Sequence, residues 1–426
     1  MAHCSGMLLF FYSCFLYLLQ PLVWLIFWRR CRRNVLYRQF WRERFGLQLL
    51  SQSDVWVHCV SLGEAKVIIP TLLALFDQYP SLIFYVTCSS PSARALIEKK
   101  LGHHVSFGYL PFDFYFCMRR FIGQLQPKIC LVVEREWWPN MLGILKRKKI
   151  PVLLCNARLS ESSLRKYYPW RWLIRSVLSA FTEVLVQAQQ DKKRLERLGI
   201  ASTRMLVTGS VKYDLEIEQA LIDKAITWRN QWGNRPVWVA GSVHSSEFNA
   251  ILSVHQKLLQ KYENALLVIA PRHPERFELC AKRIELKNLK MAKRSLKNQV
   301  HDSIQVLLVD TIGELVLFYG TADVVFIGGS LIEYGGHNPI EAAALSVPSL
   351  IGPYHENFVE ICAKLHEKKG LSYIEDAIEL YQNVLFYFRT PEVARNHGVA
   401  GLDVVAANQG ATLVQYNTIA GYLAKL

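Results

Sequence analysis

Short apolar runs alternate with longer amphipathic stretches along most of the chain, and this pattern predicts the fold class. The runs have the length and the β-branched content of strands that are buried on both faces. They are Val55–Val60, Ile83–Cys88, Ile129–Val133, Val152–Cys155, Val237–Ala240, Ala265–Ile269, Val306–Leu308 and Val324–Ile327. The stretches between them are long enough for helices, so the pattern favours parallel sheets with helices on both faces.

The strand pattern pauses in the middle of the chain, where Asp214–Trp232 is polar, charged and tipped with aromatic residues. Gly233 and Pro236 then break the chain before the apolar runs resume. We therefore expect two doubly wound α/β domains joined near residues 215–235. Ligands of such folds bind at the carboxyl ends of the strands, so we expect a cleft where those ends face each other.

The longest apolar stretch lies near the N-terminus and predicts a membrane anchor. Met7–Trp28 carries no charge and is just long enough to cross a hydrocarbon core. Seven arginines follow at once: Arg29, Arg30, Arg32, Arg33, Arg38, Arg42 and Arg44. Their position places the body of the protein in the cytoplasm and argues against a secretory signal peptide. Gln20 and Pro21 weaken a simple span and leave open a tilted or partly embedded anchor.

The charge balance narrows the class of partner. Lysine and arginine number 50 against 35 aspartate and glutamate, a net charge of +15, which suits nucleic acid, an anionic membrane or a phosphorylated substrate. The basic residues are scattered or mixed with aromatic ones, which favours a membrane surface over nucleic acid. The ten cysteines are dispersed without CxxC pairs, which favours a reduced cytosolic protein over a disulfide framework or a zinc site.

A glycine-rich loop, Gly328–Glu341, follows the apolar run Ala322–Ile327, and we expect the rest of the chain to be organised around it. Two glycine pairs permit backbone conformations and close approaches that a Cβ forbids. Asn338 is expected to cap a new helix, with Pro339 in its first turn. Such a loop is either a tight strand-to-helix turn or an anion site formed by free N–H groups. Because the features agree with one another, we favour a phosphate or nucleotide site.

Three acidic residues follow predicted strands and are candidates for proton transfer. Glu64 lies at a strand-to-helix transition, where a carboxylate either accepts a proton from a hydroxyl or complements the helix dipole. Glu134 and Glu136 follow the run Ile129–Val133, beside two tryptophans. Two carboxylates at the end of a buried strand are costly unless they are paired or functional. An ordinary ion pair with Arg135 is the alternative.

Cationic residues and short motifs at other strand ends are candidates for anion binding. Lys212 would suit a phosphate or carboxylate, although a solvated lysine is the default, and Arg272 can fork onto a phosphate. Gly313 and Glu314 could start another helix near the same cleft. The histidines show no spacing typical of metal ligands, so we expect no metal site.

Tryptophan, tyrosine and basic residues are mixed in the segment Arg158–Arg175. This mixture suits the headgroup level of a bilayer, although an amphipathic helix facing the core would explain part of it. We favour contact with membrane lipids.

Taken in order, the motifs resemble the bacterial Kdo transferases of lipopolysaccharide inner-core synthesis (glycosyltransferase family 30), which move 3-deoxy-D-manno-oct-2-ulosonic acid (Kdo) from its cytidine monophosphate ester (CMP-Kdo) onto lipid A. The resemblance covers nearly the whole chain. It is carried by SLGE at 61–64, EREWWPN at 134–140, NARLS at 156–160, TGSVKYD at 208–214, GSVHSSE at 241–247, APRHPER at 270–276, GGSLIEYGGHNPIE at 328–341 and GPYHENF at 352–358.

The resemblance implies an inverting, metal-independent glycosyltransferase of the GT-B type, in which two Rossmann-like domains face a cleft. It acts without a cofactor on the cytoplasmic face of the inner membrane, on CMP-Kdo and a lipid A precursor (lipid IVA), and adds one or more Kdo residues. The implied division is an anchor at 1–33, an acceptor-side domain at 34–215, a linker at 216–235 and a CMP-Kdo-binding domain at 236–426. Membrane lipids are expected partners and nucleic acid is not.

Roles carry over from the family residue by residue. Glu64 matches the general base that accepts the proton of the acceptor hydroxyl, and Glu134 and Lys212 match residues that stabilise the transition state. The positions that match the CMP-binding segments are Pro271, Arg272, Ile312, Gly313, Glu314, Asn338, Pro339, Ile340 and Glu341.

Two other functions remain open at this point. One is a different two-domain nucleotide-sugar enzyme, such as an epimerase or a transferase that uses another donor. The other is a membrane-anchored protein without enzymatic activity that holds nucleic acid or acidic lipids by its positive charge. Only the enzymatic hypotheses require reactive groups at the strand ends.

Overall fold

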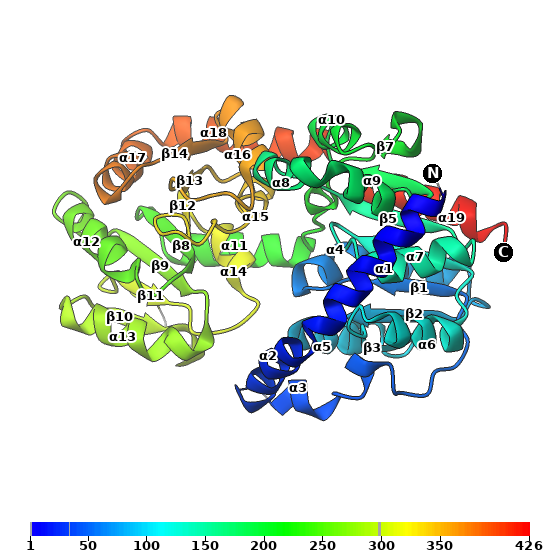
Figure 1. Cartoon of the computed structure of the whole chain (residues 1–426). Coiled ribbons are helices and arrows are strands. Elements are labelled where there is room, and N and C mark those ends of the chain that lie inside the picture. The colour runs from blue at the N-terminus through cyan, green and yellow to red at the C-terminus, as the bar shows by residue number, and fades with distance from the viewer. Residues whose placement is uncertain (1, 34, 297–299) are drawn as a thin grey trace. The chain divides into compact units, whose positions relative to one another are not determined.

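The computed structural model describes residues 2–33, 35–296 and 300–426, which form two compact α/β units (Figure 1). Unit 1 comprises Met1–Asp214 and Gln409–Leu426, and unit 2 comprises Leu215–Asn408. Each unit has its own parallel sheet with helices on its faces, as the apolar pattern predicts.

The sheet of unit 1 has seven parallel strands in the order β3-β2-β1-β4-β5-β6-β7. The strands are β1 (Val55–His58), β2 (Phe84–Cys88), β3 (Val105–Tyr109), β4 (Ile129–Val133), β5 (Val152–Ala157), β6 (Glu183–Val186) and β7 (Met205–Val207). In the centre, Val55 of β1 pairs with Ile129 of β4 and His58 with Val132. These central strands are buried along their whole length because helices cover both faces.

Helices cover both faces of this sheet. One face packs against α4 (Leu62–Gln78), α5 (Pro91–Leu101) and α19 (Ala411–Leu423). The other face packs against α6 (Tyr115–Leu125), α7 (Pro139–Arg147), α8 (Glu161–Tyr167), α9 (Arg171–Leu178) and α10 (Gln189–Arg197). Four short 3-10 helices complete unit 1: η1 (Glu43–Phe45), η2 (Tyr168–Trp170), η3 (Ser202–Arg204) and η4 (Val211–Tyr213). Alternate residues of β1 pack into the hydrophobic cores on the two faces of the sheet, Val55 and Val57 on one face and Trp56 on the other.

The N-terminal segment forms two helices, α1 (Ala2–Leu18) and α2 (Gln20–Arg33), followed by α3 (Val35–Gln39). Among the described residues, no single helix is long and apolar enough to cross a membrane. The segments Leu9–Leu18 and Gln20–Arg32 meet the criterion of length and composition only as a pair, with a bend of 58° between them. The break falls at Leu19, directly before Gln20 and Pro21, which the sequence marks as a weak point for a straight span.

The sheet of unit 2 also has seven parallel strands, in the order β10-β11-β9-β8-β12-β13-β14. They are β8 (Val237–Val243), β9 (Leu266–Pro271), β10 (Met291–Lys293), β11 (Val306–Leu308), β12 (Val324–Ile327), β13 (Ser349–Ile351) and β14 (Leu371–Tyr373). The central pair aligns Val324 of β12 with Trp238 of β8, and Ile327 with Gly241.

Helices of unit 2 also lie on its sheet. A core on one face includes α12 (Phe248–Leu259), α13 (Phe277–Leu286) and α17 (Ala377–Arg389). The remaining helices are α11 (Gln219–Gln231), α14 (Leu315–Tyr319), α15 (Ile340–Ala344), α16 (Val359–Glu367) and α18 (Pro391–Ala407), with η5 (Pro274–Arg276) and η6 (Arg294–Leu296). Of these, α14 packs on β8 and on α11 and α15, and α15 packs on α18.

The division of the chain differs in two places from the one expected from sequence. Most of the expected linker, residues 216–235, is helix α11 and belongs to unit 2, because its aromatic side chains pack there: the Trp228 ring lies 5.4 Å from that of Phe318. Residues 409–426 belong to unit 1 rather than to the C-terminal domain. Gly410 and Thr412 donate backbone hydrogen bonds to Asp214, and α19 packs on α4.

The strand order reverses between β1 and β4 in unit 1 and between β8 and β12 in unit 2, and in unit 2 β11 also lies between β9 and β10. Ligands of doubly wound folds bind outside the carboxyl ends of the strands at such a reversal. The segments that leave these four strands are therefore the first place to look for a functional site in each unit.

Candidate functional site

In unit 1, Glu64 lies at the first turn of α4, directly after β1. The Ser61 hydroxyl caps the helix by accepting a hydrogen bond from the Glu64 N–H. The Glu64 carboxylate in turn accepts from the Val60 N–H at 2.6 Å and from the Ser61 hydroxyl at 3.0 Å. These contacts form a variant of the capping box in which the N–H of Val60 replaces that of the cap residue, and they fix the carboxylate. The predicted structural role and a chemical role are therefore compatible in the same side chain.

The environment of Glu64 makes it a weaker acid than an ordinary glutamate. Burial, and then the negative charges of Glu134 and Glu136, raise its pKa to about 7, against the hydrogen bonds from Val60 and Ser61. A carboxyl group with a pKa near neutrality exists in both protonation states at physiological pH. It can therefore accept a proton from a hydroxyl and release it again.

Glu134 follows β4, the strand next to β1 at the reversal, and its backbone is in the left-handed region with φ of 60°. Such a conformation is costly for a residue with a side chain and is found preferentially at functional sites. Its N–H donates to the Cys155 carbonyl. Glu136 accepts a hydrogen bond from the Trp138 indole at 2.8 Å, and burial raises its pKa. Arg135 donates to Ser163.

Lys212 lies in the 3-10 helix η4, after the last strand of unit 1. Burial lowers its pKa, the charge of Glu134 raises it, and Arg158 lowers it again. The cation therefore interacts with the same carboxylate that acts on Glu64. The structure thus brings Glu64, Glu134 and Lys212 into one electrostatic cluster.

Asn156, near the end of β5, was not singled out by the sequence reasoning. It sits at the irregularity in the pairing of β5 with β6, with φ of 52°. The side chain is fully buried, and neither its amide oxygen nor its nitrogen has a hydrogen-bond partner among the described residues. Buried amides are normally paired, so the Asn156 side chain is an exception in the described part of the chain.

In unit 2, the loop after β12 is held by a carboxylate that sequence reasoning also missed. Glu247 is 1% exposed. Its Oε2 accepts hydrogen bonds from the backbone of Gly329 at 2.8 Å and His244 at 2.9 Å, and its Oε1 accepts from Ser330 and Leu331 at 3.2 Å each. One buried side chain thus orders the first turn of the glycine-rich loop.

The glycines of the loop meet the requirements that the sequence suggests. A Cβ on Gly328 would lie 2.6 Å from the Ser242 carbonyl oxygen, so no larger residue fits where the loop crosses β8. Gly335 and Gly336 have φ of 99° and 69°, values that glycine adopts without strain.

Three histidines of unit 2 lie close together beside this loop. The Nε2 atoms of His244 and His337 are 3.1 Å apart and their rings are parallel, while the ring of His273 lies 5.4 Å from that of His244. Burial, then the charge of Arg272, lower the pKa of His337 to about 3. Burial also lowers the pKa of His244, so the rings of His244 and His337 are neutral at pH 7 and each carries one N–H donor.

The residues matched to the CMP-binding segments fall on three loops of unit 2. Pro271 ends β9, and the Arg272 side chain that follows is exposed. Asn338 accepts a hydrogen bond from the Ile340 N–H at 3.1 Å, but the N-cap position of α15 is held by Pro339 and not by Asn338 as the sequence suggests. Pro339 directly precedes that helix, one residue before its predicted place in the first turn, and Glu341 lies in the first turn.

The third of these loops, residues 312–314, combines an exposed apolar residue with an ion-paired carboxylate. Ile312 is 80% exposed, and Gly313 has φ of 88°. The Glu314 carboxylate accepts hydrogen bonds from two nitrogens of the Arg294 guanidinium, at 2.7 and 3.0 Å, and one from the Thr311 hydroxyl. Arg294 lowers the pKa of Glu314, which stays ionised.

Within residues 2–33, 35–296 and 300–426, no group of three or more His, Cys, Asp or Glu side chains is arranged to hold a metal ion. Independence from a metal remains a prediction of the sequence.

Comparison with known proteins gives the family. The model of the family described as 3-deoxy-D-manno-octulosonic-acid transferase (kdotransferase) matches residues 39–215. The 3-deoxy-D-manno-octulosonic acid transferase of Haemophilus influenzae is 34% identical over 408 residues, which cover 94% of this chain and 96% of that protein. The enzyme of the same name from Bordetella pertussis is 35% identical, covering 80% and 82%.

Solved structures show the fold. The UDP-GlcNAc 2-epimerase from Neisseria meningitidis bound to UDP-GlcNAc superposes with a TM-score of 0.58, covering 86% of this chain and 100% of that one. At 16% identity this likeness shows a shared two-domain α/β architecture and nothing about the reaction. The sequence relatives decide the family, and they confirm the resemblance on which the carried-over roles rest: the chain belongs to the 3-deoxy-D-manno-octulosonic acid transferase family.

Proposed function

We propose that this protein transfers Kdo from CMP-Kdo to a lipid A precursor (lipid IVA) in lipopolysaccharide synthesis, with inversion and without a metal. The observation that supports it most directly is the carboxyl group of Glu64, held by a capping box at the strand reversal of unit 1 with its pKa raised to about 7. Family membership supplies the sugar, and this group supplies the proton chemistry.

Glu64 is the proton acceptor in this proposal. Displacement at the ketosidic carbon of Kdo by an acceptor hydroxyl forms a carbon–oxygen bond, breaks the bond to the phosphate of CMP, and releases the hydroxyl proton. A carboxylate with a pKa near 7 is a stronger base than an ordinary glutamate, and a substantial fraction of it is ionised at neutral pH. The proton ends on Glu64, and CMP leaves with the bonding electrons.

Charge that develops in the transition state needs stabilisation in place of a metal. Lys212 and Glu134, coupled to each other in unit 1, take this role in the proposal. The leaving CMP is assigned to unit 2, with Pro271 and Arg272, the loop Ile312–Glu314, and the segment Asn338–Glu341. Backbone N–H groups and an exposed arginine are suitable partners for a phosphate.

The proposed location is the cytoplasmic face of the inner membrane. The acceptor is a lipid that does not leave the bilayer, so the enzyme must reach it at the surface. The apolar helix α1, the apolar first half of α2, and the arginines that begin at Arg29 within α2 support membrane attachment with the rest of the chain in the cytoplasm.

The test is transfer by Glu64→Gln. Glutamine keeps a capping oxygen and the length of the side chain but is not a base, so we expect kcat to fall by ~10²–10⁴-fold with unchanged thermal unfolding. Glu98→Gln, an exposed carboxylate on α5, is the matched control and should be fully active. Transfer by Glu64→Gln at the parent rate would refute the assignment, and turnover only with uridine-linked donors would refute the substrate.

A further inference from the structure

The first helix, α1, turns polar side chains toward the protein and exposes apolar ones. Between residues 7 and 18, the side chains turned toward the protein include Tyr12, Ser13 and Tyr17, which make hydrogen bonds. The exposed residues of the same stretch are Met7, Phe10, Phe11, Cys14, Phe15 and Leu18, spaced three and four apart on one face. A helix at a water-facing surface would bury its apolar face and expose its polar one.

The polar face of α1 is fastened to unit 1. The Tyr12 hydroxyl donates to Asp113 at 3.1 Å, and the Ser13 hydroxyl donates to Asn140 at 2.8 Å. Asp113 is buried and also accepts the N–H groups of Asn140 and Met141 at the start of α7. The first helix therefore completes a hydrogen-bond network that belongs to the folded unit.

Close packing accompanies these hydrogen bonds. A Cβ on Gly143 of α7 would lie 2.5 Å from a methyl carbon of Leu9, so the missing side chain lets α1 approach α7 directly. Figure 1 shows α1 running beside α7. Farther along, the Tyr17 ring stacks on Phe114 at 5.5 Å, and in α2 the Trp24 ring stacks on Phe45 at 4.6 Å.

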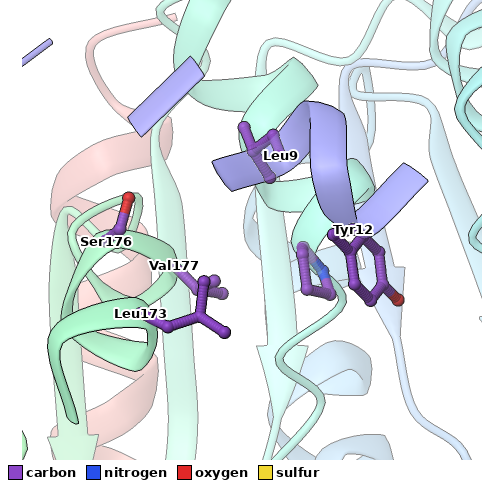
Figure 2. Close-up of a pocket in the computed structure, with 6 residues that line it drawn as sticks. Leu9, Tyr12, Leu173, Ser176 and Val177 are labelled. Carbon is purple, nitrogen blue, oxygen red and sulfur yellow. The ribbon is translucent and has the colours of Figure 1, made fainter. Parts of the chain in front are cut away.

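Exposed aromatic residues of other elements lie near α1. The Tyr17 ring lies 6.3 Å from that of Phe116, which is 68% exposed at the start of α6. On the other side, an apolar cavity of about 40 Å³ separates α1 from α9; Figure 2 shows Leu9 and Tyr12 facing Leu173 and Val177 across it. Next to this cavity, Trp170 and Trp172 are 59% and 57% exposed.

The charges around this surface are of one sign. The first 42 residues contain six arginines and no aspartate or glutamate. Arg171 and Arg175 stand beside the two exposed tryptophans, and the Arg171 guanidinium lies over the Tyr168 ring. Exposed apolar residues rimmed by aromatic and cationic ones match the boundary between acyl chains and anionic headgroups.

We propose that α1 lies in the plane of the membrane, docked on unit 1, with its Phe10–Phe15–Leu18 face, Phe116, Trp170 and Trp172 immersed in an anionic lipid surface. The helix does not cross the bilayer. A crossing would pull Tyr12 and Ser13 away from Asp113 and Asn140. The Asn140 amide oxygen would lose its donor, Asp113 would lose one of three, and the polar side chains of α1 would enter hydrocarbon, which is costly.

This inference rests on the proposed membrane location, and its test separates the two. The full chain carries a protease-cleavable tag before Met1 and a second one after Leu426, and is reconstituted into phosphatidylglycerol vesicles. In molecules whose C-terminal tag is cut by protease added outside, the in-plane arrangement predicts that the N-terminal tag is cut as well. A protected N-terminal tag on such molecules would overturn the in-plane arrangement while leaving membrane location intact.

Vesicle binding tests the lipid surface itself. Phe11→Asn with Phe15→Asn should lower partition into phosphatidylglycerol vesicles by roughly tenfold for each phenylalanine, since each loses its apolar burial. Val359→Asn, an exposed apolar residue of unit 2, is the matched control. Unchanged partition of the double variant, or equal binding to phosphatidylcholine vesicles, would overturn the proposal. So would a dimer in lipid-free solution that the double variant converts to monomer, because a second copy of the chain would then cover this face.

Discussion

Replacing Glu247 with glutamine should disorder the glycine-rich loop after β12. The two carboxylate oxygens each accept two backbone N–H groups, those of His244 and Gly329 on one oxygen and those of Ser330 and Leu331 on the other. An amide presents one oxygen and one NH₂ group. In either orientation, two backbone donors therefore face another donor.

The magnitude follows from these contacts. Each hydrogen bond to a charged acceptor contributes about 1.5–3 kcal/mol, so two lost bonds cost about 3–6 kcal/mol. Burial raises the pKa of Glu247, which means that burying the carboxylate is itself unfavourable, and the neutral amide recovers part of the loss. We expect a net destabilisation of about 2–4 kcal/mol.

Two measurements on the full chain check this reasoning. Chemical unfolding of Glu247→Gln should show the lower stability, and calorimetric titration with CMP should show affinity reduced by tenfold or more, because the loop no longer holds its binding conformation. Glu263→Gln, an exposed carboxylate of the same unit, is the control and should match the parent in both assays. Parental stability together with parental CMP affinity in Glu247→Gln would contradict the role given to this side chain.

Further predictions concern the charge cluster and the framework. Because Glu64 must be ionised to accept a proton and its pKa is about 7, kcat/KM should fall as the pH drops below 7. Glu136→Gln removes a charge that raises the pKa of Glu64, so the acid limb of the plot of kcat/KM against pH should move to lower pH. A limb that stays in place in the variant would show that another group controls the rate. Arg235 is buried and donates hydrogen bonds to the carbonyls of Asn264, Ala265, His301 and Ile304. Changing it to methionine should lower the free energy of unfolding of unit 2 by about 2–4 kcal/mol, measured by urea unfolding. An unchanged midpoint and slope would refute this. Asp214→Asn weakens the acceptor of two N–H groups at the start of α19 and should speed proteolysis there; equal cleavage rates would count against that anchor.

The sequence predicts the central strands because burial on both faces leaves a continuous apolar run. Ile129–Val133, Val306–Leu308 and Val324–Ile327 have in the structure the bounds that the pattern indicates. The pattern did not reveal short strands at the sheet edges such as β10 and β14, which have too few residues and too much exposure for a run to stand out. The pattern also predicted a linker where the structure has α11, because few side chains of this helix are buried and its packing depends on aromatic residues.

The sequence likewise predicts those site residues that local patterns mark, and misses those that depend on contacts between distant parts of the chain. Glu64 could be found because its position after a strand and at a helix start is a local pattern. Glu247 could not, because three of its four partners lie 82 to 84 residues away and meet it only when β8 and β12 pair. The unpaired amide of Asn156 and the contact between His244 and His337 likewise depend on tertiary packing. A left-handed residue at the end of β5 has no sequence signal beyond the tolerance of asparagine for that conformation.

The central claim is the transfer of Kdo itself. The most direct test incubates the protein with CMP-Kdo and a defined lipid A precursor and analyses the lipid by mass spectrometry. The account predicts that the lipid gains the mass of one or more Kdo residues while CMP is released, and that Glu64→Gln forms little of this product. A lipid of unchanged mass, or a gain that occurs only with uridine-linked donors, would contradict it.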